Sequence, residues 1–120
     1  MRVLFVCVGN TCRSQMAEGW AKHLGLEAES AGTSSHDSEV AANAVAVMAE
    51  KGIDISVQYP KSINDVDVDS FDLIYSMGCG VSCPNVPLND DWALSDPWGD
   101  DIAIYRQTRD EIERRVRELL

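Results

Sequence analysis

The chain has 120 residues, which is long enough for one domain with a sizeable hydrophobic core, and we treat residues 1–120 as a single unit. Twenty acidic residues against ten basic ones give a formal net charge of −10, which argues against general nucleic-acid binding. Such acidity is found in ordinary cytosolic enzymes and in proteins of a salt-rich cytoplasm, and it slightly favours the second. No run is long and apolar enough for a signal peptide or a membrane span, so we expect a cytoplasmic protein.

The first half of the chain alternates strand and helix patterns. Residues 2–6 are a short apolar, β-branched run that predicts a buried strand. Residues 15–24 have the apolar spacing of a helix, which Gly25 ends. A second strand is expected over residues 26–30. A second helix is expected over about residues 39–51, with Asp37 or Ser38 as its cap and Gly52 at its end.

The second half continues the alternation. Residues 62–70 are acidic and irregular, and predict at most a short helical turn. Residues 71–77 predict a strand, and residues 78–91 a loop that includes a short strand at 85–88. The last helix is expected over about residues 100–120, with arginines in its last turns that suit the helix dipole.

This alternation predicts an α/β fold of three layers, in which a four-stranded parallel sheet carries helices on both faces. Ligands of such sheets bind at the carboxyl ends of the strands. Cys7 follows the first strand and Cys79 follows the strand at 71–77, so we expect both cysteines at the same edge of the sheet.

Residues 7–14 form the turn between the first strand and the first helix, and they predict an oxyanion site. Backbone N–H groups at a helix start converge on an anion, and Gly9 and Asn10 tolerate the positive φ that a tight turn often needs. Arg13 can bind two oxygens of a tetrahedral oxyanion. The same positive environment favours the thiolate form of Cys7, to which the Ser14 hydroxyl can donate a hydrogen bond.

Four cysteines in a reducing compartment indicate catalytic, redox or metal-binding roles rather than structural disulfides. Cys79 and Cys83 lie in a glycine-flanked stretch that favours a redox relay with Cys7, because thiol–disulfide exchange needs freedom to move. Two unreactive thiols are one alternative. The other is a zinc site that adds Cys7 and Cys12, for which Arg13 is an unhelpful neighbour.

Residues 6–20, Val-Cys-Val-Gly-Asn-Thr-Cys-Arg-Ser-Gln-Met-Ala-Glu-Gly-Trp, resemble the low-molecular-weight protein tyrosine phosphatase superfamily, most closely its arsenate reductase branch. The resemblance continues through residues 30–33 and 52–56 to Ser95-Asp96-Pro97. Two details favour the reductases. Gln15-Met16 stands where phosphatases usually have Pro and an apolar residue, and Trp98-Gly99 replaces the aromatic pair typical of phosphatases.

The resemblance implies a mechanism. Arsenate, with phosphate as a competing anion, would bind to the loop, and the Cys7 thiolate would attack arsenic while Asp96 acts as general acid. Cys79 would then form a disulfide with Cys7, and Cys83 would attack Cys79 to leave a Cys79–Cys83 disulfide. Thioredoxin or a low-molecular-weight thiol would reduce that last disulfide. The oxyanion would be held by Val8, Gly9, Asn10, Thr11, Cys12, Arg13 and Ser14.

The resemblance requires no metal or flavin. Some relatives bind a monovalent cation near the residues that match Asn10, Glu18 and Ser30. Cys12 matches a cysteine that can form a protective disulfide with the nucleophile in phosphatase relatives, and here it is either a secondary redox residue or a packed thiol. Two alternatives remain open. One is a phosphatase that uses Cys7, Arg13 and Asp96 through a phosphocysteine, and the other is a non-catalytic redox or oxyanion sensor.

Overall fold

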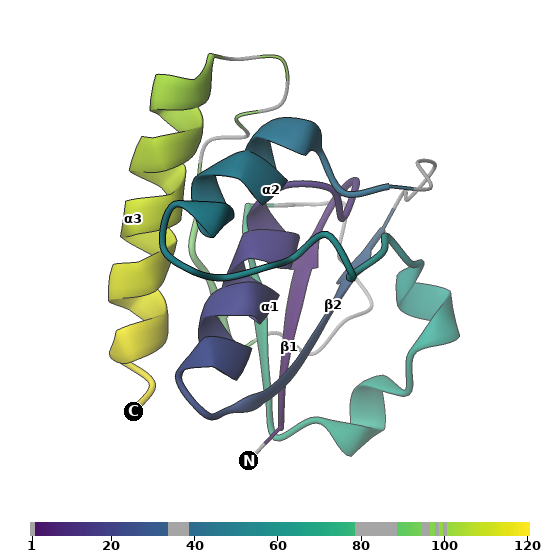
Figure 1. Ribbon diagram of the computed structural model, residues 1–120. Helices are drawn as coiled ribbons and strands as arrows, with labels where there is room; N and C mark the ends of the chain where they lie inside the picture. The colour runs from purple at the N-terminus through teal and green to yellow at the C-terminus, as the bar shows by residue number, and fades with distance from the viewer. Residues whose placement is uncertain (1, 34–38, 79–88, 95–96, 98, 100) are drawn as a thin grey trace.

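A computed structural model describes residues 2–33, 39–78, 89–94, 97, 99 and 101–120 (Figure 1). Four parallel strands form one sheet in the order β2-β1-β3-β4. They are β1 (Arg2–Cys7), β2 (Glu27–Gly32), β3 (Leu73–Ser76) and β4 (Asp90–Asp91). The apolar strand β1 lies between β2 and β3, and its residues from Val3 to Cys7 are all buried.

The two faces of β1 pack against different layers. Val3, Phe5 and Cys7 belong to a hydrophobic cluster shared with three α-helices, α1 (Arg13–His23), α2 (Ala42–Ala49) and α3 (Ile102–Arg117). Figure 1 shows α1 lying along β1 and β2, with α3 beside it. Leu4 and Val6 face a smaller cluster that includes apolar residues in and beside the 3-10 helices η1 (Ile63–Asp65) and η2 (Val68–Ser70). The three-layer α/β prediction is therefore confirmed, with 3-10 helices in the second helical layer.

Helix α2 begins later than the sequence predicts. The residue before it is Ala41, which has no side chain that can cap the helix, so the predicted cap at Asp37 or Ser38 is wrong. These two residues lie outside the described part of the chain. The Ala41 N–H instead donates to the carbonyl oxygen of Thr11 at 2.9 Å. The loop after β1 thus helps to fix the start of α2, which is a tertiary effect.

The fourth strand also differs from the prediction. The short strand expected at 85–88 lies outside the described residues, and β4 occupies Asp90–Asp91, inside the expected loop. Its two side chains are exposed, so neither apolar content nor alternation marks it as a strand. Among the described helices, none has the length and apolar character needed to cross a membrane.

Candidate active site

Cys7 ends β1 at the carboxyl edge of the sheet, and its side chain is buried. The Ser14 hydroxyl oxygen lies 2.8 Å from Cys7 Sγ, and the Asn10 backbone N–H donates to the same sulfur at 3.1 Å. The Asn10 side-chain amide donates to the Ser14 hydroxyl at 2.7 Å. The Ser14 oxygen therefore accepts from Asn10, and its own proton can point to Cys7. Two donors aimed at one sulfur stabilise a thiolate.

The backbone conformation of Asn10 directs its N–H toward Cys7 Sγ. Asn10 adopts φ 56°, in the left-handed region, and it is fully buried. Its side-chain oxygen accepts from the Lys61 backbone N–H at 2.8 Å and from the Gln15 side-chain amide at 3.1 Å. Of the two residues that tolerate a positive φ, Asn10 adopts one, whereas Gly9 is not among the glycines with positive φ.

Gln15 joins the loop to a segment far along the chain. Its amide nitrogen donates to the carbonyl oxygens of Asn10 and Tyr59, both at 3.0 Å. Gln58 in turn donates to the Gln15 carbonyl oxygen at 3.1 Å and to its side-chain oxygen at 2.8 Å. Gln58 and Lys61 were not predicted from the sequence, because nothing in their own segment indicates contact with residues 10–15.

Arg13 opens α1 and is almost completely buried. Its Nη1 donates to the carbonyl oxygens of Met77 and Leu94, both at 2.9 Å. These carbonyls follow β3 and β4, so the guanidinium is held at the same strand edge as Cys7. Gly78 has φ 119°, and a Cβ built there would lie 3.0 Å from Arg13 Nη1. The structure thus brings together the predicted nucleophile and the predicted oxyanion-binding arginine.

Four other cysteine and aspartate residues were predicted for the site, and the structure describes one of them, Cys12. Asp96, Cys79 and Cys83 lie outside the described residues, so their predicted roles stay predictions. Cys12 is buried, and its sulfur lies 3.5 Å from the Thr11 hydroxyl and 3.5 Å from the Tyr105 hydroxyl. Cys12 therefore contacts α3 at the base of the loop.

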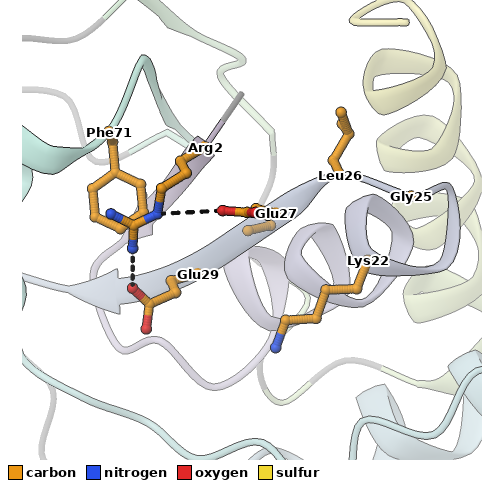
Figure 2. A pocket seen from close by; sticks show the side chains of 8 residues that line it. Arg2, Lys22, Gly25, Leu26, Glu27, Glu29 and Phe71 are labelled. Carbon is orange, nitrogen blue, oxygen red and sulfur yellow. Dashed lines mark hydrogen bonds and ion pairs between the residues drawn. The ribbon is translucent and has the colours of Figure 1, made fainter.

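A pocket of about 450 Å³ lies at the opposite end of the sheet (Figure 2). The Arg2 guanidinium lies 4.5 Å from the centre of the Phe71 ring and pairs with Glu29 at 3.4 Å and Glu27 at 3.8 Å. Arg2 and Cys7 occupy the two ends of β1, roughly 17 Å apart at the usual strand rise. The charges of this pocket compensate one another, and it is separate from the cysteine site.

The arrangement at Cys7 places a buried thiol, a tight loop, a helix start and an arginine at one point. A family model described as low molecular weight phosphotyrosine protein phosphatase matches residues 2–120. The chain belongs to this family. The resemblance predicted from residues 6–20 is confirmed, and the chain is a phosphatase-family enzyme.

Relatives within the phosphatase family include proteins named as reductases. A protein of Synechocystis sp. named glutaredoxin arsenate reductase is 41% identical, over 99% of this chain and 95% of its own length. A solved structure described as an arsenate reductase in the phosphate binding state has a TM-score of 0.90 and 40% identity, over 98% of this chain and 95% of that one. The low molecular weight protein tyrosine phosphatase from T. tengcongensis has a TM-score of 0.85 and 34% identity, over 99% and 97%.

A cluster around Glu18 lies next to the loop of this phosphatase-family chain. Glu18 is buried on α1, and its carboxylate accepts from the Ser30 hydroxyl at 2.6 Å and from the Lys22 ammonium at 2.6 Å. The Lys61 ammonium lies 3.9 Å from it. The nearby side-chain oxygen of Asn10 already accepts two N–H groups. These oxygens are occupied by donors and two ammonium groups, so the residues do not fit the monovalent cation that the resemblance implies.

Proposed function

We propose that the protein reduces arsenate to arsenite with Cys7 as the nucleophile. The observation that carries the proposal is the pair of donors on Cys7 Sγ, the Ser14 hydroxyl and the Asn10 N–H, at the start of a helix that also holds Arg13. This arrangement suits a thiolate that attacks a tetrahedral oxyanion. Reductase chemistry is favoured by the reductase-named relatives and by the Cys79/Cys83 pair in the sequence.

In the first step, backbone N–H groups of residues 8–14 and the Arg13 guanidinium bind the arsenate oxygens. The Cys7 thiolate attacks arsenic and forms a sulfur–arsenic bond. Asp96 gives a proton to the departing As–OH oxygen, which leaves as water. The product is a covalent Cys7–arsenate adduct, in which arsenic is still pentavalent.

In the second step, the Cys79 thiolate attacks Cys7 Sγ. The sulfur–arsenic bond breaks and its electron pair stays on arsenic, which becomes trivalent and leaves as arsenite. The two sulfurs are oxidised to a Cys7–Cys79 disulfide, so the two electrons come from the two cysteines. The Cys83 thiolate then attacks Cys79 and releases the Cys7 thiolate, which leaves a Cys79–Cys83 disulfide.

An external thiol system must reduce that last disulfide. We propose either thioredoxin or a low-molecular-weight thiol acting with glutaredoxin. The name of the Synechocystis relative supports the second of these. The spacing of three residues between Cys79 and Cys83 is compatible with an accessible disulfide only if the segment bends.

A phosphatase is the second candidate, because phosphate and arsenate have nearly the same shape and charge. The same Cys7 and Arg13 would then form a phosphocysteine, with Asp96 protonating the leaving alcohol. The likeness to the T. tengcongensis phosphatase supports this candidate. The Cys79/Cys83 pair has no role in that reaction.

The test is steady-state turnover with two reducing systems. The reduced protein is given arsenate with the thioredoxin system or with glutathione and glutaredoxin, and NADPH consumption is followed. Hydrolysis of an aryl phosphate is measured in parallel. We expect arsenate-dependent NADPH oxidation that Cys7→Ser abolishes. Aryl phosphate hydrolysis without arsenate reduction under either system would contradict the proposal and favour the phosphatase.

A further inference from the structure

Glu18 is a buried carboxylate, and such a charge needs partners inside the fold. Its partners differ in exposure. The Lys22 side chain is 51% exposed, so water can compete for its ammonium. The Lys61 side chain is only 13% exposed, so its ammonium, 3.9 Å from Glu18, is largely withdrawn from solvent. Lys61 is therefore the enclosed positive charge of this cluster.

Lys61 is also tied to the loop that holds Cys7. Its backbone N–H donates to the Asn10 side-chain oxygen at 2.8 Å, and its carbonyl oxygen accepts from the Gly32 N–H at 2.8 Å. Asn10 in turn donates to Cys7 Sγ through its backbone and to the Ser14 hydroxyl through its side chain. Lys61 thus contacts Glu18 through its ammonium and, through its backbone, the Asn10 side chain whose residue donates to the Cys7 thiol.

We propose that Lys61 is a positioning residue, a built-in counter-ion of Glu18 that stands in place of a monovalent cation beside the Cys7 loop. The ammonium keeps the buried carboxylate from opposing negative charge at Cys7 and its anionic substrate. The loop then needs no monovalent cation from solution. This inference rests on the assignment of Cys7 as the nucleophile, but its test uses neither arsenate nor a reductant.

The first experiment uses the wild-type chain and exchanges the cation. The midpoint of thermal unfolding is measured in potassium, sodium and choline chloride at one ionic strength. We expect the three midpoints to agree within about 1 °C. A cation that bound only the folded state would raise the midpoint, by roughly 5 °C at concentrations well above its dissociation constant. A saturable rise of that kind in potassium or sodium would overturn the proposal.

The second experiment follows Cys7 itself. Alkylation of Cys7 by iodoacetamide is quantified by mass spectrometry of its peptide, as a function of pH in choline chloride. For Lys61→Met we expect the midpoint of this profile to rise by about 0.5 to 1 pH unit, because the uncompensated Glu18 carboxylate disfavours a thiolate. Lys61→Arg should restore the wild-type profile. Lys51→Met removes an exposed lysine and is the charge-matched control, expected to have no effect.

A midpoint for Lys61→Met equal to that of the wild type and of Lys51→Met would overturn the proposal. Arsenate turnover decides the proposed function separately, since neither readout here requires it. If Lys61→Met does not fold, the cation exchange on the wild-type chain still decides.

Discussion

Gln15 holds Asn10 at two points, because its amide nitrogen donates to the Asn10 carbonyl oxygen at 3.0 Å and to the Asn10 side-chain oxygen at 3.1 Å. Asparagine reaches the left-handed region more readily than most residues other than glycine. The two hydrogen bonds from Gln15 hold Asn10 in that conformation. They keep the Asn10 N–H directed at Cys7.

Gln15→Ala should therefore reduce both stability and reactivity. We expect the free energy of unfolding to fall by about 1–3 kcal/mol, because the buried oxygens of Asn10 lose a donor. The rate of arsenite formation in a single turnover should fall with it. Gln58→Ala removes only the hydrogen bonds that Gln58 donates to Gln15, so its effect on both quantities should be smaller. Urea unfolding and rapid-quench kinetics give the two values, and equal effects of the two variants would contradict this account.

Gly32 allows β2 to approach the loop closely, because it has no Cβ. A Cβ at this position would lie 2.7 Å from the Val8 carbonyl oxygen and 3.0 Å from Asn10 Cβ. Gly32→Ala should displace the loop and lower the single-turnover rate by about tenfold or more, equivalent to roughly 1.4 kcal/mol. Gly9→Ala is the control, because its Cβ would meet only the Thr11 hydroxyl, at 3.6 Å, and its backbone does not have a positive φ. A loop that tolerated both alanines would contradict the close approach described here.

The Ser14 hydroxyl oxygen lies 2.8 Å from Cys7 Sγ and accepts from the Asn10 side-chain amide, so its proton is available to the sulfur. Ser14→Ala should slow the alkylation of Cys7 by iodoacetamide at pH 7, by roughly tenfold if the lost hydrogen bond to a charged group is worth about 1.5 kcal/mol. Ser56→Ala, in an exposed turn with Asp54, serves as the control. An unchanged alkylation rate in Ser14→Ala would mean that the hydroxyl does not stabilise the reactive form of Cys7.

The strand, loop and helix around Cys7 could be predicted from the sequence because their signals are local. An apolar run, a glycine-containing turn and helical spacing follow one another within residues 2–24. The members of the site that are contiguous in sequence, from Cys7 to Ser14, were found in the same way. The start of α2 could not be predicted, because it depends on the hydrogen bond from the Ala41 N–H to the Thr11 carbonyl oxygen.

Two other features gave no sequence signal for a related reason. Strand β4 consists of two exposed aspartates that pair with β3 through their backbone. Lys61 reaches the site through its own backbone N–H, which any residue except proline offers. Contacts made by backbone atoms across a fold depend on its three-dimensional arrangement and not on residue type.

Glu50 joins α2 to α3 through Arg106 and Arg109. Hydrogen bonds from Arg106 and then Arg109 lower the pKa of Glu50 from 4.5 to about 2. A carboxylate with a lowered pKa stabilises the folded state fully above its unfolded pKa, and loses that contribution as the pH falls. The wild type should therefore lose stability between about pH 4.5 and pH 2.

Glu50→Gln should be less stable than the wild type at pH 7, and the difference should shrink through that acidic range. Urea unfolding at a series of pH values measures it, and high salt should reduce the difference because the ion pairs are partly exposed. A difference that did not change with pH would show that the charge of Glu50 is not the cause.

In the proposed reaction, Cys7 attacks arsenate and the electrons pass through Cys79 and Cys83. The most direct measurement is a single turnover of fully reduced protein with arsenate and no external reductant, with arsenite quantified and disulfides mapped by mass spectrometry. We predict about one arsenite per protein, a Cys79–Cys83 disulfide in the wild type and a trapped Cys7–Cys79 disulfide in Cys83→Ser, since each arsenate needs two electrons. Arsenite that forms only after a small thiol is added would contradict the intramolecular relay.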